Sequence, residues 1–188
     1  MSEQPYRNEK RVLLLYSEDV NLNEISFLPK ALSKVFKIMF FEINKYAFRL
    51  PLHTYDRNRK QYNSTLLLKY LPLFEPEGYD KYLGIVNVDL YTDSLNFVFG
   101  EAILSGKEAI ISLCRLRPEF YGNPSDEKLF KIRIVKEAVH ELGHVFGLTH
   151  CKNYKCVMHF SNSIRDTDLK STYPCPLCQI RLFDRMGR

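Results

Sequence analysis

The sequence predicts a mixed α/β (α+β) fold, in which helices flank a mixed, twisted sheet. Short apolar runs of strand length alternate along the chain with longer segments of helical periodicity, a pattern typical of this fold class. With 188 residues, 45% of them hydrophobic, the chain can bury a substantial core. No stretch rich in proline, glycine or serine divides it, so we expect a single domain spanning residues 1–188.

The N-terminal part is expected to form a strand, a helix and a second strand. Apolar runs typical of β-strands extend from Arg11 to Tyr16 and from Lys37 to Ile43. Residues 22–35 between them can supply a helix, provided that Pro29 lies early in the helix or interrupts it, because proline has no backbone N–H to donate. Residues 63–71 predict a further helix.

The middle of the chain is expected to supply the remaining strands. Tyr82 to Leu90 is typical of a buried strand. Asn96 to Leu104 and Glu108 to Leu113 follow as two strands, joined by a hairpin turn at residues 105–107. Cys114 ends the second of these apolar runs, so we expect it to be a buried strand residue with no ligand or nucleophile role.

Asn123 and Pro124 predict the start of a long helix, with an N-cap followed by proline at the first helical position. Acidic residues at 126–127 then lie near the positive end of the helix dipole. His140 and His144 fall outside the apolar stripe of this helix, so we expect them on an open face. The residues that recur every three or four positions to form the core-facing stripe are Leu129, Ile132, Val135, Val139, Leu142 and Phe146.

The segment HELGHVFGLTH, which begins at His140, places three imidazoles and a carboxylate where one metal ion can use all of them. Because His140 and His144 are four residues apart on a helix, both can reach one zinc ion. Glu141 is then positioned to act on a metal-bound water. A helix continuing past His144 would carry the next histidine away, whereas Gly147 can take a positive φ and return His150 toward the metal.

An HExxH sequence alone can also be a pair of solvated surface histidines on a helix. The glycine at the turn and the histidine at the third-ligand position are two further, independent requirements, and this sequence meets both. The pattern therefore favours a catalytic zinc site. Affinity order alone leaves another divalent metal open at these histidines.

Four cysteines downstream offer a second set of ligands: Cys151, Cys156, Cys175 and Cys178. Their arrangement as one looser pair and one CxxC pair matches a closed, tetrahedral zinc site of the structural kind. The alternatives are two disulfides or reduced cysteines in the core. Disulfides need an oxidising compartment, and nothing in the sequence directs the chain to one. We therefore predict two zinc ions per chain, one catalytic and one structural.

The two predicted metal sites are joined by a single peptide bond. His150 and Cys151 are neighbours, with Cα atoms about 3.8 Å apart. Each side chain reaches its metal over a few ångströms, so the two ions can lie no more than roughly 14 Å apart. We expect the cysteine-bound zinc to brace the backbone that aims His150, so that removing Cys151 or Cys156 loosens the third ligand as well.

These residues resemble a known family. The string from His140 to His150 resembles the metzincin zinc signature, and with the four cysteines and Met158 behind it the sequence is similar to the archaemetzincins, a family of two-zinc metallopeptidases. Residues 96–102 resemble the edge-strand region above the zinc in that family. The resemblance implies a single metzincin-like catalytic domain with a zincin-like sheet, an active-site helix and a small C-terminal zinc-bound subdomain. It also implies that Met158 forms an apolar floor beneath the catalytic zinc.

The expected function is peptide-bond hydrolysis by a zinc-dependent metallopeptidase. His140, His144 and His150 would bind the zinc, and Glu141 would be the general base that activates the zinc-bound water. The family resemblance suggests an aminopeptidase-like enzyme. The competing hypothesis is a non-catalytic, zinc-stabilised module that binds peptide or nucleic acid.

Composition limits the partners. The net charge of +5 is mild, and the lysines and arginines are interleaved with other residues, as in residues 57–60 and 128–136. This distribution indicates a solvated surface, so we expect no nucleic-acid partner. No apolar run is long enough for a signal-peptide core or a membrane span, so we expect a cytoplasmic protein without a membrane partner. We expect a monomer that acts on a peptide or unfolded protein.

Overall fold

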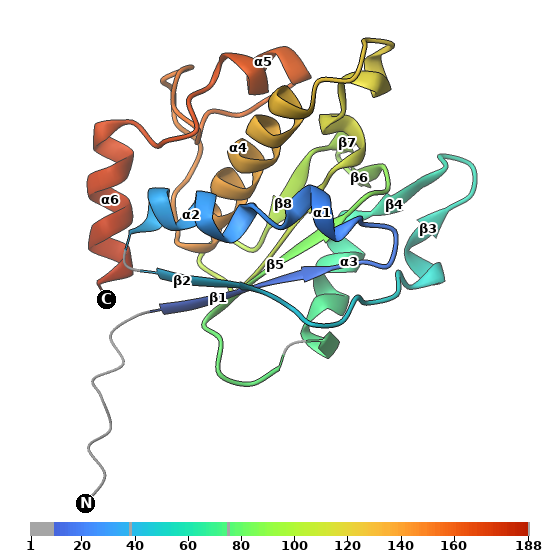
Figure 1. Cartoon of the computed structure of the whole chain (residues 1–188), viewed down its shortest axis with the longest axis horizontal. Helices are drawn as coiled ribbons and strands as arrows, with labels where there is room; N and C mark the ends of the chain where they lie inside the picture. Colours follow the sequence, from blue (N-terminus) through green and yellow to red (C-terminus); the bar gives the residue numbers. More distant parts are fainter. Residues whose placement is uncertain (1–9, 38, 75, 188) are drawn as a thin grey trace, which may run out of the picture.

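The computed structural model describes residues 10–187 apart from residues 38 and 75 (Figure 1). The first nine residues, on which part of the prediction about a secretion signal rests, lie outside the described residues, as does one residue of the predicted strand from Lys37 to Ile43. Among the helices that the structure describes, none has the length and apolar character needed to span a membrane.

The main sheet has five strands in the order β2-β1-β5-β9-β8. The first four run parallel to one another, and β8 pairs antiparallel with β9 at the edge, which confirms the predicted mixed sheet. Four of the strands lie within a few residues of their predicted positions. Their bounds are Lys10–Tyr16 (β1), Met39–Ile43 (β2), Lys81–Val86 (β5), Gly100–Ala102 (β8) and Glu108–Ser112 (β9).

A second, smaller sheet stands beside the first, with the strand order β3-β4-β6-β7. Its strands are Tyr55–Asp56 (β3), Gln61–Asn63 (β4), Leu90–Thr92 (β6) and Leu95–Val98 (β7). The sequence did not predict β3 and β4, because strands of two and three residues are too short to show a recognisable alternation.

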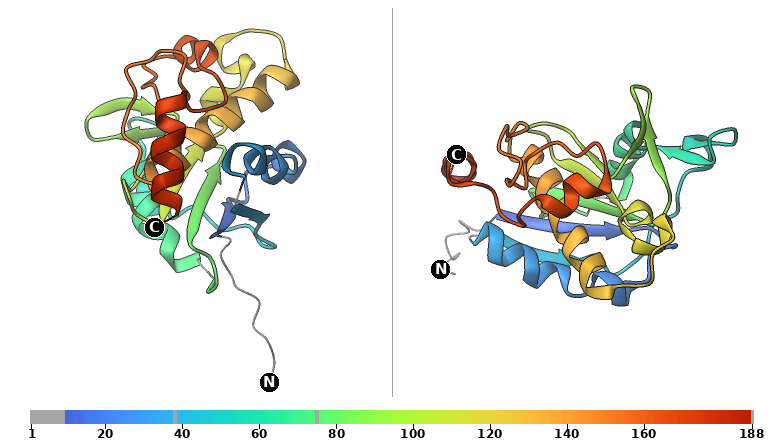
Figure 2. Two further views of the ribbon diagram at one scale, coloured as in Figure 1. Left: turned by 90° about the vertical axis from the view of Figure 1, so that its left-hand side faces the viewer. Right: turned by 90° about the horizontal axis from the view of Figure 1, so that it is seen from above.

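Helices cover both faces of the main sheet (Figures 1 and 2). Along β1, Val12 and Leu14 pack into a cluster shared with α2 and α4, whereas Leu13 and Leu15 pack into a cluster shared with α3. Alternate residues of a strand point to opposite faces, so this pattern places α2 and α4 on one face and α3 on the other. The α-helices are Leu22–Ile25 (α1), Leu28–Phe36 (α2), Ser64–Tyr70 (α3), Glu127–Val145 (α4), Ile164–Leu169 (α5) and Pro176–Met186 (α6), and the 3₁₀ helices are Leu52–Thr54, Leu71–Phe74, Cys114–Leu116 and Pro118–Tyr121.

Several predicted boundaries were wrong. The helix predicted over residues 22–35 is divided into α1 and α2, and Pro29 lies in the first turn of α2, where its missing N–H costs nothing. The strand predicted up to Leu90 ends at Val86, and Leu90 begins β6. The strand predicted from Asn96 to Leu104 is two strands in two sheets, β7 and β8, separated by Phe99. Cys114 is half-buried in a 3₁₀ helix and not in a strand.

The N-cap of helix α4 lies three residues later than predicted. The N-cap is Asp126, whose Oδ1 accepts a hydrogen bond from the backbone N–H of Leu129 at 2.9 Å, and Asn123 and Pro124 lie in the exposed segment before it. The predicted core stripe is also partly wrong, because three of its members are only half-buried: Leu129, Ile132 and Val135. The stripe that packs into the core is instead made of Phe130, Ile134, Ala138, Val139, Leu142 and Val145.

Candidate active site and cysteine cluster

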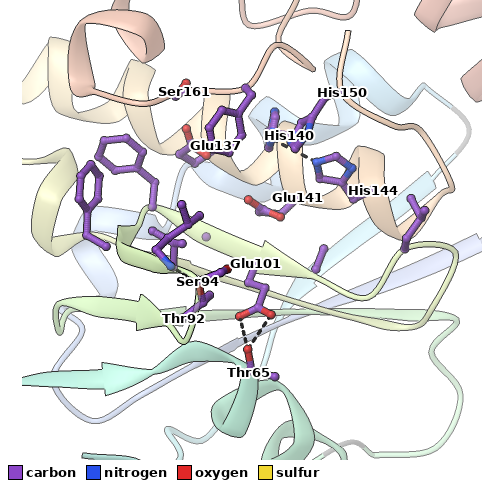
Figure 3. Close-up of a pocket in the computed structure, with 18 of the residues that line it drawn as sticks. Thr65, Thr92, Ser94, Glu101, Glu137, His140, Glu141, His144, His150 and Ser161 are labelled. Atoms are coloured by element: carbon purple, nitrogen blue, oxygen red, sulfur yellow. Dashed lines mark hydrogen bonds between the residues drawn. The ribbon is translucent and has the colours of Figure 1, made fainter. Parts of the chain in front are cut away.

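The three predicted histidine ligands converge on one point in the structure. His140 and His144 come from successive turns of α4, and their Nε2 atoms are 3.1 Å apart. A ring nitrogen of His150 lies within 4.8 Å of both, so one ion could be held by all three side chains (Figure 3). The spacing on the helix and the turn after it therefore bring together the residues that the sequence singled out.

Backbone contacts orient two of the rings for metal binding. His140 Nδ1 lies 2.8 Å from the carbonyl oxygen of Val157, and His144 Nδ1 lies 2.7 Å from that of Leu148. A carbonyl can only accept, so Nδ1 carries the proton and the Nε2 lone pair is free for a metal. Burial also lowers the pKa of His140, and it lowers the pKa of His144 to about 4, which keeps both imidazoles neutral. These rings fit a zinc ion.

Gly147 makes the turn that returns the third histidine. Its φ is +86°, a left-handed conformation that favours glycine, and its N–H donates to the carbonyl of His144 at 2.8 Å. Two side chains pack against its Cα, the Arg185 guanidinium from α6 and the Ser105 hydroxyl from the turn between β8 and β9. The turn therefore packs against both α6 and the turn between β8 and β9.

Met158 lies under this part of α4 and is fully buried. A Cβ at Gly143, one residue before His144, would overlap the Met158 sulfur. Glycine at this position is what allows the helix and the methionine to pack so closely. The position of Met158 fits the apolar floor that the family resemblance implies.

Glu141 points into the same pocket with only 4% of its surface exposed. Burial raises the pKa of its carboxyl well above the ordinary value, the nearby Glu137 and Glu101 raise it further, and Lys170 opposes them. On its other side the Glu141 side chain packs against β8, where a Cβ on Gly100 would lie 2.7 Å from Glu141 Cγ and 2.8 Å from its Oε1. Glycine in the edge strand therefore makes room for this carboxylate.

A network of buried charges lies between α4 and α5. It was not expected from the sequence, which predicted a solvated surface for residues 128–136. Arg133 forms a bidentate ion pair with Asp168, with contacts of 2.8 and 2.7 Å, and it is 4% exposed. Lys136 Nζ donates to the carbonyls of Thr167 and Asp168 at 2.9 and 2.8 Å. The prediction is wrong at these two positions because α5 folds over this face of α4 and supplies partners from more than 30 residues away.

The same network reaches the pocket through Glu137 and Lys170. Their side chains are 3.7 Å apart, and only 3% and 0% of their surfaces are exposed. Lys170 Nζ also donates to the carbonyl of His159, next to Met158. The chain after the methionine is thereby tied to the helix that carries the histidines.

The four predicted cysteines also come together. Their sulfur atoms all lie within 4.8 Å of one another, all four are free thiols in the structure, and the backbone N–H of Cys175 donates to the sulfur of Cys156 at 3.1 Å. Burial raises the pKa of Cys178, whereas hydrogen bonds from Cys178 and the other thiols outweigh burial and lower the pKa of Cys175. Four convergent sulfurs are the donor set of a closed tetrahedral zinc site, and they fit that ion.

The two clusters are connected by more than the peptide bond between His150 and Cys151. The N–H of Cys151 donates to the carbonyl of Met158 at 2.9 Å, and His159 Nδ1 contacts the carbonyl of Cys151 at 2.8 Å. Val157, which follows Cys156, supplies the carbonyl that orients His140. The backbone of the cysteine cluster therefore touches both the first and the third histidine.

The histidines and Glu141 line a pocket of about 540 Å³ that extends around the free edge of β8 (Figure 3). On the α4 side it is lined by Glu137, Thr149, Phe160 and Ser161, and on the other side by Thr65, Glu101 and the hairpin between β6 and β7. Glu101 lies within residues 96–102, which the family resemblance placed above the zinc. Thr65 and residues 92–95 were not expected at the site, because sheet pairing brings them there from other parts of the chain.

Comparisons with known proteins agree with this geometry. Residues 52–184 match the family model described as Peptidase family M54. An archaemetzincin of Methanocaldococcus jannaschii is 52% identical over 167 residues, covering 89% of each chain. An archaemetzincin of Pyrococcus furiosus is 47% identical over 176 residues, covering 90% of this chain and 91% of the relative.

Solved structures are similar over nearly the whole chain. The crystal structure of archaemetzincin from Methanopyrus kandleri superposes with a TM-score of 0.87 at 33% identity, covering 98% of this chain and 99% of that one. The crystal structure of archaemetzincin from Archaeoglobus fulgidus complexed with malonate gives a TM-score of 0.78 at 37% identity, covering 91% and 99% of the two chains. The mixed sheet and its helices are thus shared with solved proteins.

Proposed function

This chain belongs to peptidase family M54, the archaemetzincins, a family of zinc metallopeptidases, and we propose that it cleaves peptide bonds by metzincin-type chemistry at the histidine cluster. The observation that carries the proposal is the position of Glu141 beside three convergent imidazoles in the wall of a pocket. We propose two zinc ions per chain, a catalytic one held by His140, His144 and His150 and a structural one held by the four cysteines.

When bound by the three imidazoles, zinc supplies a Lewis acid that polarises the substrate carbonyl and lowers the pKa of water. Glu141 then acts as the general base: it accepts the proton of the attacking water and passes it to the departing amine. Burial supports this role, because a raised pKa makes the carboxylate a better proton acceptor. Contact with Gly100 limits the orientations that the Glu141 side chain can take.

The free edge of β8 supports peptide as the substrate. Among the described strands β8 pairs only with β9, and Gly100, Glu101 and Ala102 all line the pocket. Unpaired backbone groups on an edge strand can bind an extended peptide, which would then run directly past Glu141. We propose that small peptides or unfolded segments are cleaved, with the aminopeptidase-like character that the family resemblance suggests.

We propose that the chain acts as a monomer with no nucleic-acid partner. The residues that we assign to the chemistry, the three histidines and Glu141, all belong to one chain, so the proposed reaction needs no residue from a second copy. The competing hypothesis of a non-catalytic binding module is not favoured by membership in a family of peptidases.

Replacing Glu141 with glutamine tests the assignment of the general base. The substitution keeps the size of the side chain and its packing against Gly100, but it removes the group that accepts the proton. We expect peptide-library cleavage to fall by about 10²- to 10⁴-fold while the zinc content stays at the wild-type level. The control is Glu127→Gln at the exposed start of α4, which should retain full activity. Wild-type turnover in Glu141→Gln would refute the assignment.

A further inference from the structure

Glu101 lies on the edge strand next to Gly100 but faces the opposite side of the sheet. In the antiparallel pairing of β8 with β9, Gly100 pairs with Ile111 and Glu101 pairs with Ile110. Ile111 belongs to the core cluster under α4, and Ile110 to the cluster under α3. Because paired residues share a face, Gly100 is directed toward Glu141 and Glu101 toward α3. Figure 3 shows the two carboxylates on either side of β8.

The carboxylate of Glu101 is held by hydroxyl groups. Thr65 Oγ1 donates to Oε1 and Oε2 of Glu101 at 2.8 and 3.1 Å, and Ser64 Oγ donates to Oε2. Both hydroxyls come from the first turn of α3. The side chain is therefore fixed in place beside the pocket that Glu101 lines, and two hydroxyl donors leave a carboxylate with further acceptor capacity.

No cation balances this carboxylate within the described part of the chain. None of the ion pairs among the described residues includes Glu101, and no lysine or arginine lines the pocket. By contrast, Glu137 on the α4 side of the pocket is paired with Lys170. A second carboxylate, that of Asp93 on the hairpin between β6 and β7, also lines the pocket and accepts a hydrogen bond from Asn63 at 3.1 Å. The α3 side of the pocket is therefore negatively charged.

We propose that Glu101, assisted by Asp93, binds a positively charged group of the substrate and so determines specificity. This inference rests on the proposed peptidase function. A peptide that pairs with the free edge of β8 places alternate side chains on opposite faces, so the residue next to the one facing Glu141 is directed toward Glu101. A cationic group there forms charge-assisted hydrogen bonds with a carboxylate that is already oriented.

The positively charged group has two possible sources, a lysine or arginine side chain and a free terminal amine. Matched peptides separate them. The peptides of the first series have an acetylated N-terminus and carry lysine, norleucine or glutamate at single positions around the cleaved bond. The second series has the norleucine sequence with a free N-terminus. Cleavage is measured as kcat and KM with the zinc-loaded protein, and affinity is measured separately by fluorescence anisotropy of labelled peptides.

We expect the wild-type protein to prefer one cationic series over its neutral partner by about tenfold or more, in affinity and in kcat/KM. Glu101→Gln should reduce this preference to within about twofold, because it removes the charge that the cationic peptides bind, whereas the neutral peptide has no such interaction to lose. Asp93→Asn, on an exposed hairpin where folding is not at risk, should remove a smaller part of it. Glu127→Gln is the control and should change nothing.

Two results would overturn the proposal: no preference for either cationic series in the wild-type protein, or a preference that Glu101→Gln and Asp93→Asn leave intact. If no peptide is cleaved by any variant, the proposed peptidase function fails, and the anisotropy measurements alone decide whether Glu101 binds a cation. A preference seen only with the free N-terminus identifies the terminal amine as the group bound. A preference seen only with the lysine peptides identifies the side chain.

Discussion

Replacing Cys178 with serine removes one thiolate from the cysteine cluster without changing the segment that carries His150. Cys178 is buried on α6, and its sulfur lies within 4.8 Å of the other three. The substitution therefore tests whether the cysteine site stabilises the histidine site from a distance. We expect it to abolish the structural zinc, because closed sites of this kind need four ligands.

The effect on the histidine site follows from the contacts between the two clusters. Loss of the structural zinc frees the segment from Cys156 to His159, and with it the Val157 carbonyl that orients His140 at 2.8 Å. It also frees Cys151, which is bonded to His150 and donates to Met158 at 2.9 Å. Changing one group that orients a ligand typically weakens metal binding 10- to 100-fold, or about 1.4 to 2.8 kcal/mol. We expect the binding of the remaining zinc at the histidine site to be weakened by at least this amount.

The assay combines total zinc content with the dissociation constant of the remaining ion, measured by competition with a chelator of known affinity. Cobalt substitution shows which site is filled, because thiolate and imidazole ligands give different absorption spectra. Cys114→Ser is the matched control, since Cys114 lies outside both clusters and should leave both zinc ions in place. An unchanged affinity at the histidines, together with loss of one zinc, would refute the coupling.

Two further predictions concern the turn and the histidines. Gly147→Ala should lower the free energy of unfolding, measured by urea titration, by about 1 to 3 kcal/mol, because alanine at a φ of +86° is strained and its Cβ meets Arg185 and Ser105. The control is Gly187→Ala, whose Cβ would make only an ordinary 3.5 Å contact. In metal-free protein, burial lowers the pKa of His144 from 6.5 to about 4. Between these pH values the unfolded chain binds more protons than the folded chain, so the free energy of unfolding should fall as the pH decreases from 6.5 to 4. The urea titrations should be made with the Glu141→Gln variant, because the raised pKa of Glu141 has the opposite effect on the pH dependence of stability. A free energy of unfolding that does not change between pH 6.5 and 4 would contradict this prediction.

The histidine and cysteine clusters could be proposed from the sequence because their geometry is almost entirely local. Four residues of helix fix the distance between His140 and His144, and one glycine suffices to return His150. The alternation of apolar runs likewise indicated the mixed sheet and most of its strands. These features depend on spacing along the chain, which a sequence states directly.

The charged face of α4 could not be predicted in this way. Arg133 and Lys136 have the spacing of ordinary solvated residues, and nothing near them in the sequence indicates otherwise. Their burial depends on α5, which supplies a carboxylate from Asp168 and two backbone carbonyls. Burying a cation is costly unless partners of this kind replace water. A pattern of charges therefore predicts a surface until the position of a distant segment is known.

The edge strand β8 shows the same limit at the site itself. The sequence placed Gly100 and Glu101 on a strand, but a strand alone does not decide which of its two faces meets the catalytic helix. The register against β9 decides it: a shift of one residue would direct Glu101 at Glu141 and leave Gly100 facing α3. Two carboxylates would then compete for the space that Gly100 leaves open, at the cost of a like-charge contact in a buried pocket. The observed register avoids this contact and leaves Glu101 free for a charge that the substrate brings.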